Sequence, residues 1–247
     1  MTAASPSLES RRVTAYYADI SELDIESRAE RALRWLDAGE RARYHRFRVD
    51  DDRQMFLMGR VMARALVGRA LGVPPTGWTW REGPHGRPEI ASPDTPLRFN
   101  IAHSACLVVC ALAAGREVGV DVEDLRRRPI EPGLVYRYFA QAEVADIGVG
   151  TSGWERKFLS YWTLKEAYLK ARGLGLSVHL ADVGFALDAP EPRISFSRSM
   201  AGSQTRWRFH LAQPTERHMI AVAASAADGV RPEIDLRPFE FQLELSS

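Results

Sequence analysis

The sequence predicts an α+β protein organised as a pseudo-dimer, in which each of two similar subdomains packs a small antiparallel sheet on one long helix. Two observations support this prediction. Apolar residues recur with helical spacing over two segments of about twenty residues, one in each half of the chain. Short strand-like segments between turn residues follow each helix, and the last of them is strongly apolar in both halves. The halves share little sequence identity, so the repeat is one of pattern.

Composition and charge narrow the classes of function. Of the 247 residues, 45% are hydrophobic, which suffices for a folded core, and the formal net charge of +1 gives no global basic bias toward nucleic acid. No apolar run reaches the length of about eighteen residues that a membrane helix needs, and residues 1–12 lack the apolar core of a signal peptide. We therefore expect a cytoplasmic protein that binds neither membranes nor nucleic acid.

The two cysteines, Cys106 and Cys110, lie four residues apart in an apolar run. The sequence places no cysteine or histidine partners near them at the spacing of a zinc site. On a strand the two side chains share one face. We therefore predict that both are reduced residues of the core.

The first predicted subdomain covers residues 1–115. Its elements are a strand, two helices and three more strands, at residues 13–18, 27–38, 50–71, 78–81, 97–101 and 107–113. One of the aspartates at 50–52 is expected to cap the second helix, which ends at Gly72 before two prolines. The last strand is too apolar to lie at an exposed sheet edge.

Between the two helices lies a basic run, residues 40–48, with the sequence ERARYHRFR. Two interpretations are open. The run can be a solvated helical face, or it can clamp a phosphate or another polyanion, because arginines make bidentate, charge-assisted bonds to phosphate oxygens. The turn-rich loop at residues 83–88 exposes a further arginine, Arg87.

The second predicted subdomain covers residues 116–230, and residues 231–247 form a tail. Its elements are a strand, two short helices, one long helix and four strands, at residues 118–123, 132–139, 140–147, 154–172, 183–187, 194–197, 205–211 and 219–224. Gly173 and Gly175 end the long helix.

The strand at residues 118–123 carries the first candidate site. Its valines alternate with Gly119, Asp121 and Glu123, so the two carboxylates project together from the face opposite the valines. Neighbouring carboxylates raise each other's pKa unless a positive charge lies between them. Mg²⁺ suits this position because it takes oxygen ligands and retains waters. The alternative is a solvated strand edge.

The long helix adds a third carboxylate. Glu166 lies on the same stripe as Phe158, Trp162 and Leu169, and an ionised carboxylate on a buried face is costly unless it is paired or metal-bound. Lys170 follows four residues later and can share the site with it. A surface salt bridge between the two is the alternative.

Acidic and basic candidates together suggest a class of chemistry. Carboxylates that hold a metal, with basic groups that hold phosphate, are the set required for phosphoryl-type transfer. The basic candidates are Arg43, Arg87, His103 and Lys170. The sequence contains neither a Walker loop nor a Gly-x-Gly-x-x-Gly motif, which argues against nucleotide triphosphatases of those types.

Three segments in order resemble the motifs of the 4′-phosphopantetheinyl transferases: FNIAHS at 99–104, GVDVE at 119–123 and WTLKEAYLK at 162–170. The chain length and the Gly-Arg-Pro loop at 86–88 resemble the single-chain bacterial type, similar to the surfactin synthetase-activating enzyme. The resemblance implies coenzyme A in a cleft between the subdomains. It also implies transfer of the phosphopantetheine arm to a serine of an apo acyl or peptidyl carrier protein, with release of 3′,5′-ADP.

The resemblance also assigns roles to residues. It implies that Mg²⁺ is held on the coenzyme A pyrophosphate by Asp121, Glu123 and Glu166, with Glu166 also a candidate base for the serine proton. It implies that coenzyme A is bound by Arg43 and Arg87 at the nucleotide end and by His103, Ser104 and Lys170 at the phosphates. Lys170 and the three carboxylates form the implied catalytic set.

Two positions depart from the family pattern. Ala102 stands where many relatives have a serine that contacts phosphate, and Glu40 stands where some have a basic residue, which leaves Arg41 as its substitute. The expected protein is a monomer. Two other functions use the same residues: a Mg²⁺-dependent hydrolase of coenzyme A-like pyrophosphates, and a coenzyme A-binding module without catalytic activity.

Overall fold

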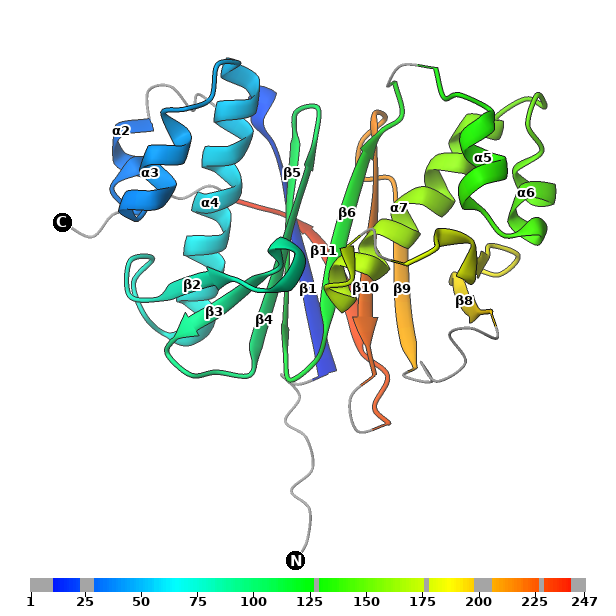
Figure 1. Ribbon diagram of the computed structural model, residues 1–247. Coiled ribbons are helices and arrows are strands. Elements are labelled where there is room, and N and C mark those ends of the chain that lie inside the picture. Colours follow the sequence, from blue (N-terminus) through cyan, green and yellow to red (C-terminus); the bar gives the residue numbers. More distant parts are fainter. Residues whose placement is uncertain are drawn as a thin grey trace, which may run out of the picture.

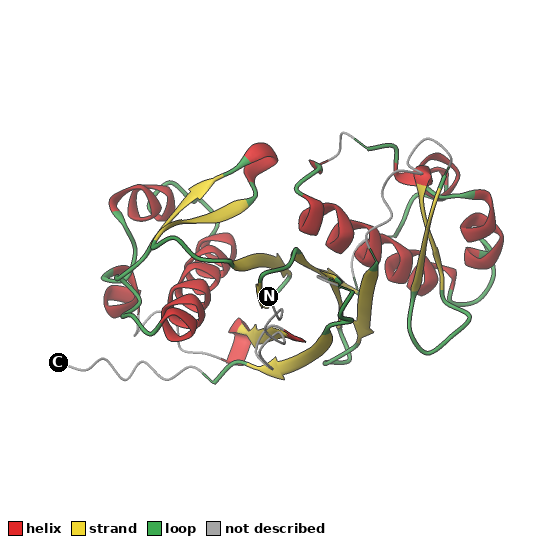
Figure 2. Ribbon diagram, turned by 90° about the horizontal axis from the view of Figure 1, so that it is seen from below, coloured by secondary structure: helices red, strands yellow, loops and turns green. Residues whose placement is uncertain are grey.

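The structure is a computed structural model that describes residues 11–22, 29–126, 129–175, 178–197, 206–226 and 229–240. Two groups of helices lie on either side of a central set of strands (Figure 1). Seen from below, the same two groups remain separated by the strands (Figure 2). The α+β pseudo-dimer predicted from the sequence is confirmed.

The first half begins with a strand and ends with a hairpin. Its elements are β1 (Arg12–Asp19), η1 (Ile20–Glu22), α2 (Ala29–Leu33), α3 (Ala38–Tyr44), α4 (Asp50–Leu71), β2 (Thr79–Glu82), η3 (Pro84–Gly86), β3 (Pro88–Ser92), β4 (Leu97–Ser104) and β5 (Leu107–Ala114).

The second half repeats the combination of a long helix with a small sheet. Its elements are β6 (Val118–Asp124), α5 (Gly133–Tyr138), α6 (Gln141–Ile147), α7 (Trp154–Arg172), η5 (Leu180–Asp182), β7 (Val183–Ala186), β8 (Arg193–Phe196), β9 (Trp207–Ala212), β10 (His218–Ser225) and β11 (Glu233–Pro238). In the part of the chain that the structure describes, no helix is long and apolar enough to cross a membrane.

The predicted helix at 27–38 is wrong, since α2 ends at Leu33 and a second helix, α3, begins at Ala38; residues 27 and 28 lie outside the described part. The cause is a capping box: Asp37 accepts a hydrogen bond from the Glu40 amide at 2.8 Å, and Glu40 accepts one from the Asp37 amide at 2.9 Å. The predicted cap of α4 is also wrong. Val49 occupies the N-cap position, and the three aspartates lie in the first turn, where the helix dipole favours negative charge.

The two main sheets have the strand orders β11-β1-β5-β4 and β6-β10-β9. Neighbours are antiparallel except for β11, which pairs with β1 in parallel. The prediction of purely antiparallel sheets is therefore wrong for this one pair, because the strand that covers β1 comes from the C-terminal tail. Two hairpins, β2-β3 and β7-β8, complete the described sheets.

Three buried clusters form the core. One lies between α4 and the first sheet, and another lies between α7 and the second sheet. The third joins the two sheets and includes Val118, Val120 and Val122 of β6. This confirms the predicted valine face, and it leaves the opposite face of β6 directed toward α7. Across the same junction, the Val120 amide donates a hydrogen bond to Asn100 Oδ1 of β4 at 2.9 Å.

Candidate active site

The acidic strand lies against α7 because Gly119 has no side chain. A Cβ at this position would be 2.2 Å from the Ala167 carbonyl oxygen and 2.4 Å from the Ala171 amide nitrogen. Only glycine allows so close an approach between the two backbones. The contact brings β6, with Asp121 and Glu123, beside the α7 residues Glu166 and Lys170.

The three predicted carboxylates share one pocket. Asp121, Glu123 and Glu166 line a cavity of about 930 Å³ in the second half, together with apolar and aromatic residues such as Trp162. Asp121 is buried, so the alternative of a solvated strand edge is wrong for this residue. Burial raises the pKa of Glu166, the charge of Asp121 raises it further, and Lys170 opposes the shift.

Lys170 neutralises Asp121 directly. Its Nζ atom lies 2.6 Å from Asp121 Oδ1. Lys170 therefore pairs with Asp121, and not with Glu166 in the surface salt bridge that was the alternative. The carboxylates of this pocket, among them Glu166 with its raised pKa, are the kind of ligand that a hard cation such as Mg²⁺ takes. Among the described residues, only Asp19, Cys106 and His218 bring three potential ligand atoms within 4.8 Å of one another, so the three cleft carboxylates do not converge on one point here.

Basic side chains line two further pockets, one beside the acidic pocket and the other beyond it. A pocket of about 290 Å³ contains Glu166, Lys170 and Arg87, so it shares Glu166 with the acidic pocket. A pocket of about 430 Å³ contains Arg43, Arg60 and His103. The two basic pockets share Gly86, Pro88 and Ile101. We call the three joined pockets the cleft; it contains residues of both halves and changes from acidic to basic along its length.

Family models match both halves of the chain. Residues 25–115 match the model described as 4′-phosphopantetheinyl transferase, N-terminal, and residues 117–223 match that of the 4′-phosphopantetheinyl transferase superfamily. A phosphopantetheinyl transferase of Thraustochytrium sp. is 34% identical over 213 residues, which cover 78% of this chain and 74% of that protein. The chain belongs to the 4′-phosphopantetheinyl transferase superfamily.

Two bacterial relatives extend the comparison. The 4′-phosphopantetheinyl transferase HetI of Nostoc sp. is 34% identical over 170 residues, covering 68% of this chain and 71% of HetI. The 4′-phosphopantetheinyl transferase Sfp of Bacillus subtilis is 28% identical over 153 residues, covering 61% of this chain and 66% of Sfp. The family and type predicted from the three motifs are confirmed.

One cation of this transferase was missed in the sequence. Arg60 lies in the middle of α4, in a segment that reads as core, yet it lines the basic pocket. Its guanidinium carbon lies 4.0 Å from the ring centre of Trp80 and 4.9 Å from that of Phe56. Burial lowers the pKa of Arg60 to about 10, so it remains charged at neutral pH. The spacing of Phe56 and Arg60, four residues apart on one helix, was the available signal.

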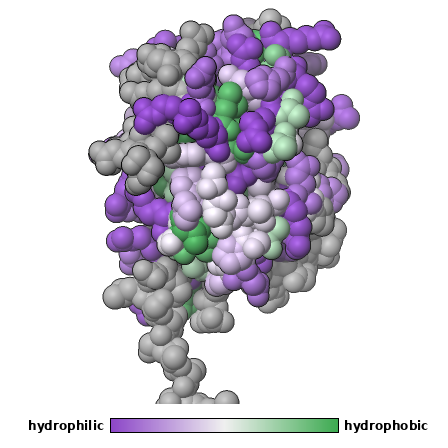
Figure 3. Space-filling view, turned by 90° about the vertical axis from the view of Figure 1, so that its left-hand side faces the viewer, coloured by the Kyte–Doolittle hydropathy of each residue, from purple (hydrophilic) through white to green (hydrophobic). Residues whose placement is uncertain are grey.

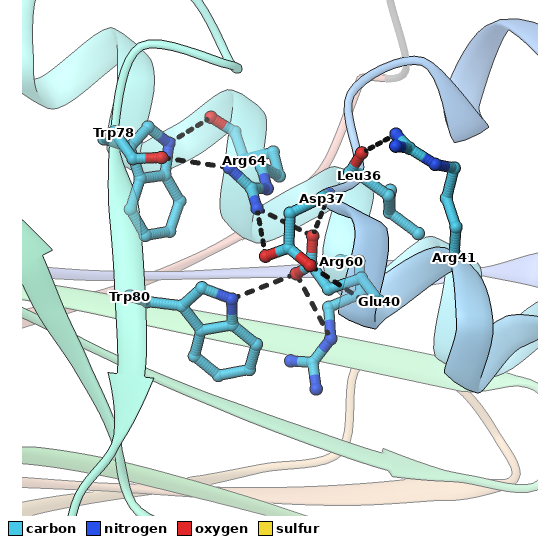
Figure 4. Close-up of polar contacts among 8 residues, drawn as sticks. All are labelled: Leu36, Asp37, Glu40, Arg41, Arg60, Arg64, Trp78 and Trp80. Carbon is cyan, nitrogen blue, oxygen red and sulfur yellow. Dashed lines mark hydrogen bonds and ion pairs between the residues drawn. The ribbon is translucent and has the colours of Figure 1, made fainter.

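Glu40 departs from the family pattern for a structural reason (Figure 4). It is buried and accepts hydrogen bonds from Arg64 at 2.7 Å and from Trp80 Nε1 at 3.1 Å, while Arg60 Nε lies 3.6 Å away. Glu40 thus ties α3 to α4 and β2 and fixes the ring on which Arg60 stacks. The expected substitute, Arg41, instead donates to the carbonyl of Leu36, and it is not among the described residues that line the cleft.

The basic run of α3 divides between the two interpretations. Arg43 faces the cleft, stacks on Phe56 at 5.3 Å and lies 3.8 Å from Glu82. On the outer side of the first half, hydrophilic residues surround a paler centre that includes small hydrophobic patches (Figure 3). The run is therefore mostly a solvated face, but Glu40 is buried, Tyr44 and Phe47 pack against the core, and Arg43 faces the cleft.

The remaining predicted ligands occupy different positions. His103 lines the basic pocket; partial burial lowers its pKa, as do the charges of Lys170, Arg60 and Arg43, although Asp52 opposes them. Ser104 ends β4 and is not among the described residues lining the cleft. Ala102 is buried in the layer between the sheets.

Arg87 approaches the cleft from the loop between β2 and β3. Its Nη1 atom lies 4.0 Å from Glu117 Oε1, and burial lowers its pKa. A Cβ on Gly173 would lie 3.0 Å from Arg87 Cδ, so this glycine leaves room for the arginine against the end of α7.

Lys165 in the third motif has a supporting position that the sequence did not indicate. It is fully buried, its Nζ lies 2.7 Å from Glu143 Oε2, and it donates to the carbonyls of Leu180, at 2.8 Å, and Val183. Glu143 in turn accepts a bond from the Phe185 amide at 2.8 Å. Lys165 thereby holds the η5 wall of the acidic pocket against α7.

Proposed function

We propose that this chain transfers the 4′-phosphopantetheine arm of coenzyme A to a serine of an apo acyl or peptidyl carrier protein. The serine oxygen attacks the phosphorus that bears pantetheine, and the bond between that phosphorus and the bridging oxygen breaks. 3′,5′-ADP leaves, and the serine proton passes to a base. The observation that supports this function is the cleft, whose carboxylates and cations lie in joined pockets lined by both halves.

The acidic pocket fits Mg²⁺ by its donor set. Asp121, Glu123 and Glu166 would hold the ion, which would neutralise charge on the pyrophosphate. Lys170 now balances Asp121, and with coenzyme A bound it can turn toward a phosphate instead. Glu166, with its raised pKa, is suited to accept the serine proton directly or through water.

The basic pockets would hold the rest of coenzyme A. Arg43, Arg60 and His103 would bind one group of phosphate oxygens, and Arg87 with Lys170 would bind another. The rigid stacking of Arg60 on Trp80 supports this role, because a guanidinium that is already ordered loses little entropy on binding.

The carrier would dock on the second half. Leu134, Tyr138, Trp162 and Val178 line the acidic pocket beside Glu166 and offer apolar contact. Arg126, which is exposed and 3.9 Å from Glu216, would help to steer an acidic carrier. The sequence Arg126-Arg127-Arg128 predicts the same role for the two neighbouring arginines, which lie outside the described residues.

Three further features are part of the proposal. The subdomains are residues 1–115 and 116–230, with a tail at 231–247, and the two family matches, 25–115 and 117–223, support a division there. The working unit is a monomer, because both walls of the cleft come from one chain. The cytoplasmic location stays a prediction from the sequence.

Mass spectrometry of a reaction with coenzyme A, Mg²⁺ and an apo carrier tests the function. We expect a carrier heavier by one phosphopantetheine group, together with 3′,5′-ADP. Released phosphopantetheine with an unchanged carrier would show a hydrolase instead. If the protein binds coenzyme A but modifies no carrier of the fatty acid, polyketide or nonribosomal peptide class, it is a binding module.

A further inference from the structure

Three side chains with metal-binding atoms meet at one end of the junction between the halves. Asp19 is the last residue of β1, Cys106 lies in the turn between β4 and β5, and His218 is the first residue of β10. One potential ligand atom from each lies within 4.8 Å of the other two. Cys106 Sγ and His218 Nε2 are 3.8 Å apart. Both cysteines are free, as predicted; Cys110 is fully buried in the core, whereas Cys106 is half-buried at the edge of the core.

The distances suit a tetrahedral ion. Zinc binds thiolate sulfur at about 2.3 Å and imidazole nitrogen at about 2.0 Å, which places two such ligands about 3.6 Å apart. The observed 3.8 Å is close to this value. Thiolate and imidazole favour Zn²⁺ and Co²⁺ over Mg²⁺, so the set differs in kind from the carboxylates of the cleft. One thiolate and one carboxylate also balance the charge of a divalent ion.

The backbone fixes the three ligands before any ion binds. Asp19 is paired with Leu107 in the β1–β5 register, and the Ile20 amide donates to the Cys106 carbonyl at 2.8 Å. Ala105 closes the turn before Cys106 with a left-handed φ of 51°. His218 is paired with Asp124 in the β6–β10 register. A site made by both sheets is thus already assembled.

Outer partners orient two of the ligands, as is usual around bound metals. Asp19 Oδ1 accepts hydrogen bonds from the Ser21 amide at 3.0 Å and from the Ser21 hydroxyl at 2.6 Å. A carboxylate can accept about four such bonds, so capacity for an ion remains. His218 Nδ1 lies 2.9 Å from Thr215 Oγ1, and this contact holds the ring with Nε2 directed at Cys106 Sγ. The nearby cation Arg217 is neutralised by Asp124 at 2.7 Å.

We propose that Asp19, Cys106 and His218 bind one Zn²⁺-like ion that joins the two halves, with water as the fourth ligand. On binding, the Cys106 thiol releases its proton to solvent and the thiolate coordinates the metal. The site is separate from the cleft, since its three residues are not among the described residues that line it. Cys106 lies three residues after His103 in the sequence, so the ion would fix the turn that follows β4.

Cobalt binding by the full chain tests this site. The protein is stripped with a chelator and titrated with Co²⁺ in excess Mg²⁺, which occupies hard oxygen sites. We expect one Co²⁺ per chain with a thiolate-to-cobalt charge-transfer band, its displacement by Zn²⁺, and a higher melting temperature with Zn²⁺. Cys106→Ser should abolish the band, and Asp19→Asn, at a half-buried position that should tolerate the change, should weaken Co²⁺ binding at least tenfold.

Two controls make the result specific. Cys110→Ala removes the other thiol and should leave the band unchanged. Glu166→Gln should also keep it, which separates this site from the metal proposed for transfer. If stripped wild-type protein gives no thiolate band, or if the band survives Cys106→Ser, the three residues form a hydrogen-bonded cluster without a metal and the proposal is wrong.

Discussion

Lys170 Nζ lies 2.6 Å from Asp121 Oδ1, so a lysine of α7 balances the buried carboxylate of β6 before any cation or substrate binds. The pair is asymmetric: Asp121 is buried, whereas a third of the Lys170 side chain is exposed. Loss of the lysine would leave a buried charge, while loss of the aspartate would leave a cation that can reach water.

Lys170→Met should lower the free energy of unfolding by about 1–3 kcal/mol without Mg²⁺, because Asp121 loses its counter-charge. Urea titration measures this loss. Mg²⁺ should restore more stability to this variant than it adds to wild type. Lys157→Met, also on α7, removes an exposed pair with Asp146 of α6 and should cost under about 1 kcal/mol. Equal losses in both variants would show that burial of Asp121 is unimportant.

Removal of the proposed metal or of its α7 ligand should stop transfer. Excess EDTA, or Glu166→Gln, should lower kcat at least about a hundredfold while circular dichroism stays unchanged, because leaving-group charge is then uncompensated. Glu155→Gln, at the exposed start of the same helix, is the matched control and should retain activity. Full turnover in EDTA would refute the Mg²⁺ site.

The three arginines of the two basic pockets should discriminate between nucleotides. Arg43→Ala, Arg60→Ala and Arg87→Ala should each raise the KM for coenzyme A roughly tenfold to a hundredfold, since a charge-assisted bond contributes about 1.5–3 kcal/mol. If one of these arginines contacts the 3′-phosphate, its alanine variant should show a much smaller rise in KM with 3′-dephospho-coenzyme A than with coenzyme A. Arg41→Ala should change neither KM by more than about twofold, because its guanidinium bonds Leu36. A large effect there would reinstate Arg41 as a ligand.

His103 should make coenzyme A binding depend on pH. Its pKa is lowered in the free protein, so it is neutral at pH 7, and bound phosphates would raise that pKa. The affinity for coenzyme A that charged His103 adds is then fully present below the pKa of His103 in the free protein. It is lost as pH rises through the pKa of His103 in the complex. Titration calorimetry from about pH 5.5 to about pH 8 should show proton uptake and tighter binding at the acidic end.

His103→Gln should remove that part of the pH dependence, and the difference between variant and wild type is the relevant quantity because phosphate itself titrates near pH 6. His210→Gln is the control: its pKa is also lowered by burial, but it is not among the described residues of the cleft. Identical profiles for His103→Gln and wild type would exclude His103 as a phosphate contact.

Gly119→Ala should be the most damaging single-methyl change in the second half. The added Cβ would lie 2.2 Å from a backbone oxygen of α7, so strand and helix must separate, at a cost of about 3 kcal/mol or more. A fall in melting temperature with loss of turnover is expected. At Gly133 an added Cβ would lie 3.5 Å from its nearest atom, Glu131 Oε1, so Gly133→Ala should change stability by less than about 1 kcal/mol.

Local patterns predicted the elements that carry the acids. The stripe that includes Phe158 and Leu169 defined α7 from Trp154 to Arg172, and the valine alternation defined β6. Both depend on periodicities of a few residues, which a sequence displays directly. The break between α2 and α3 also has a local signal, because Asp37 and Glu40 have the spacing of a capping box.

Contacts between distant segments could not be predicted from the sequence. Arg60 reads as part of a core helix until Trp80 and Glu40, twenty residues away on either side, are placed around it. Cys106 and His218 are more than a hundred residues apart, so no spacing rule for zinc sites could pair them. Such groups form because sheet register, rather than chain proximity, decides which side chains meet.

The pairing of β11 with β1 has a consequence for biosynthesis. The strand that covers the edge of β1 is made more than two hundred residues after β1 itself. Until then β1 presents unpaired backbone groups to other chains, which favours aggregation. A fragment ending at residue 115 would keep this edge exposed permanently. The amino-terminal half should therefore complete its sheet only after β11 has been made, and separate expression of the two halves should yield insoluble material unless residues 233–238 are supplied.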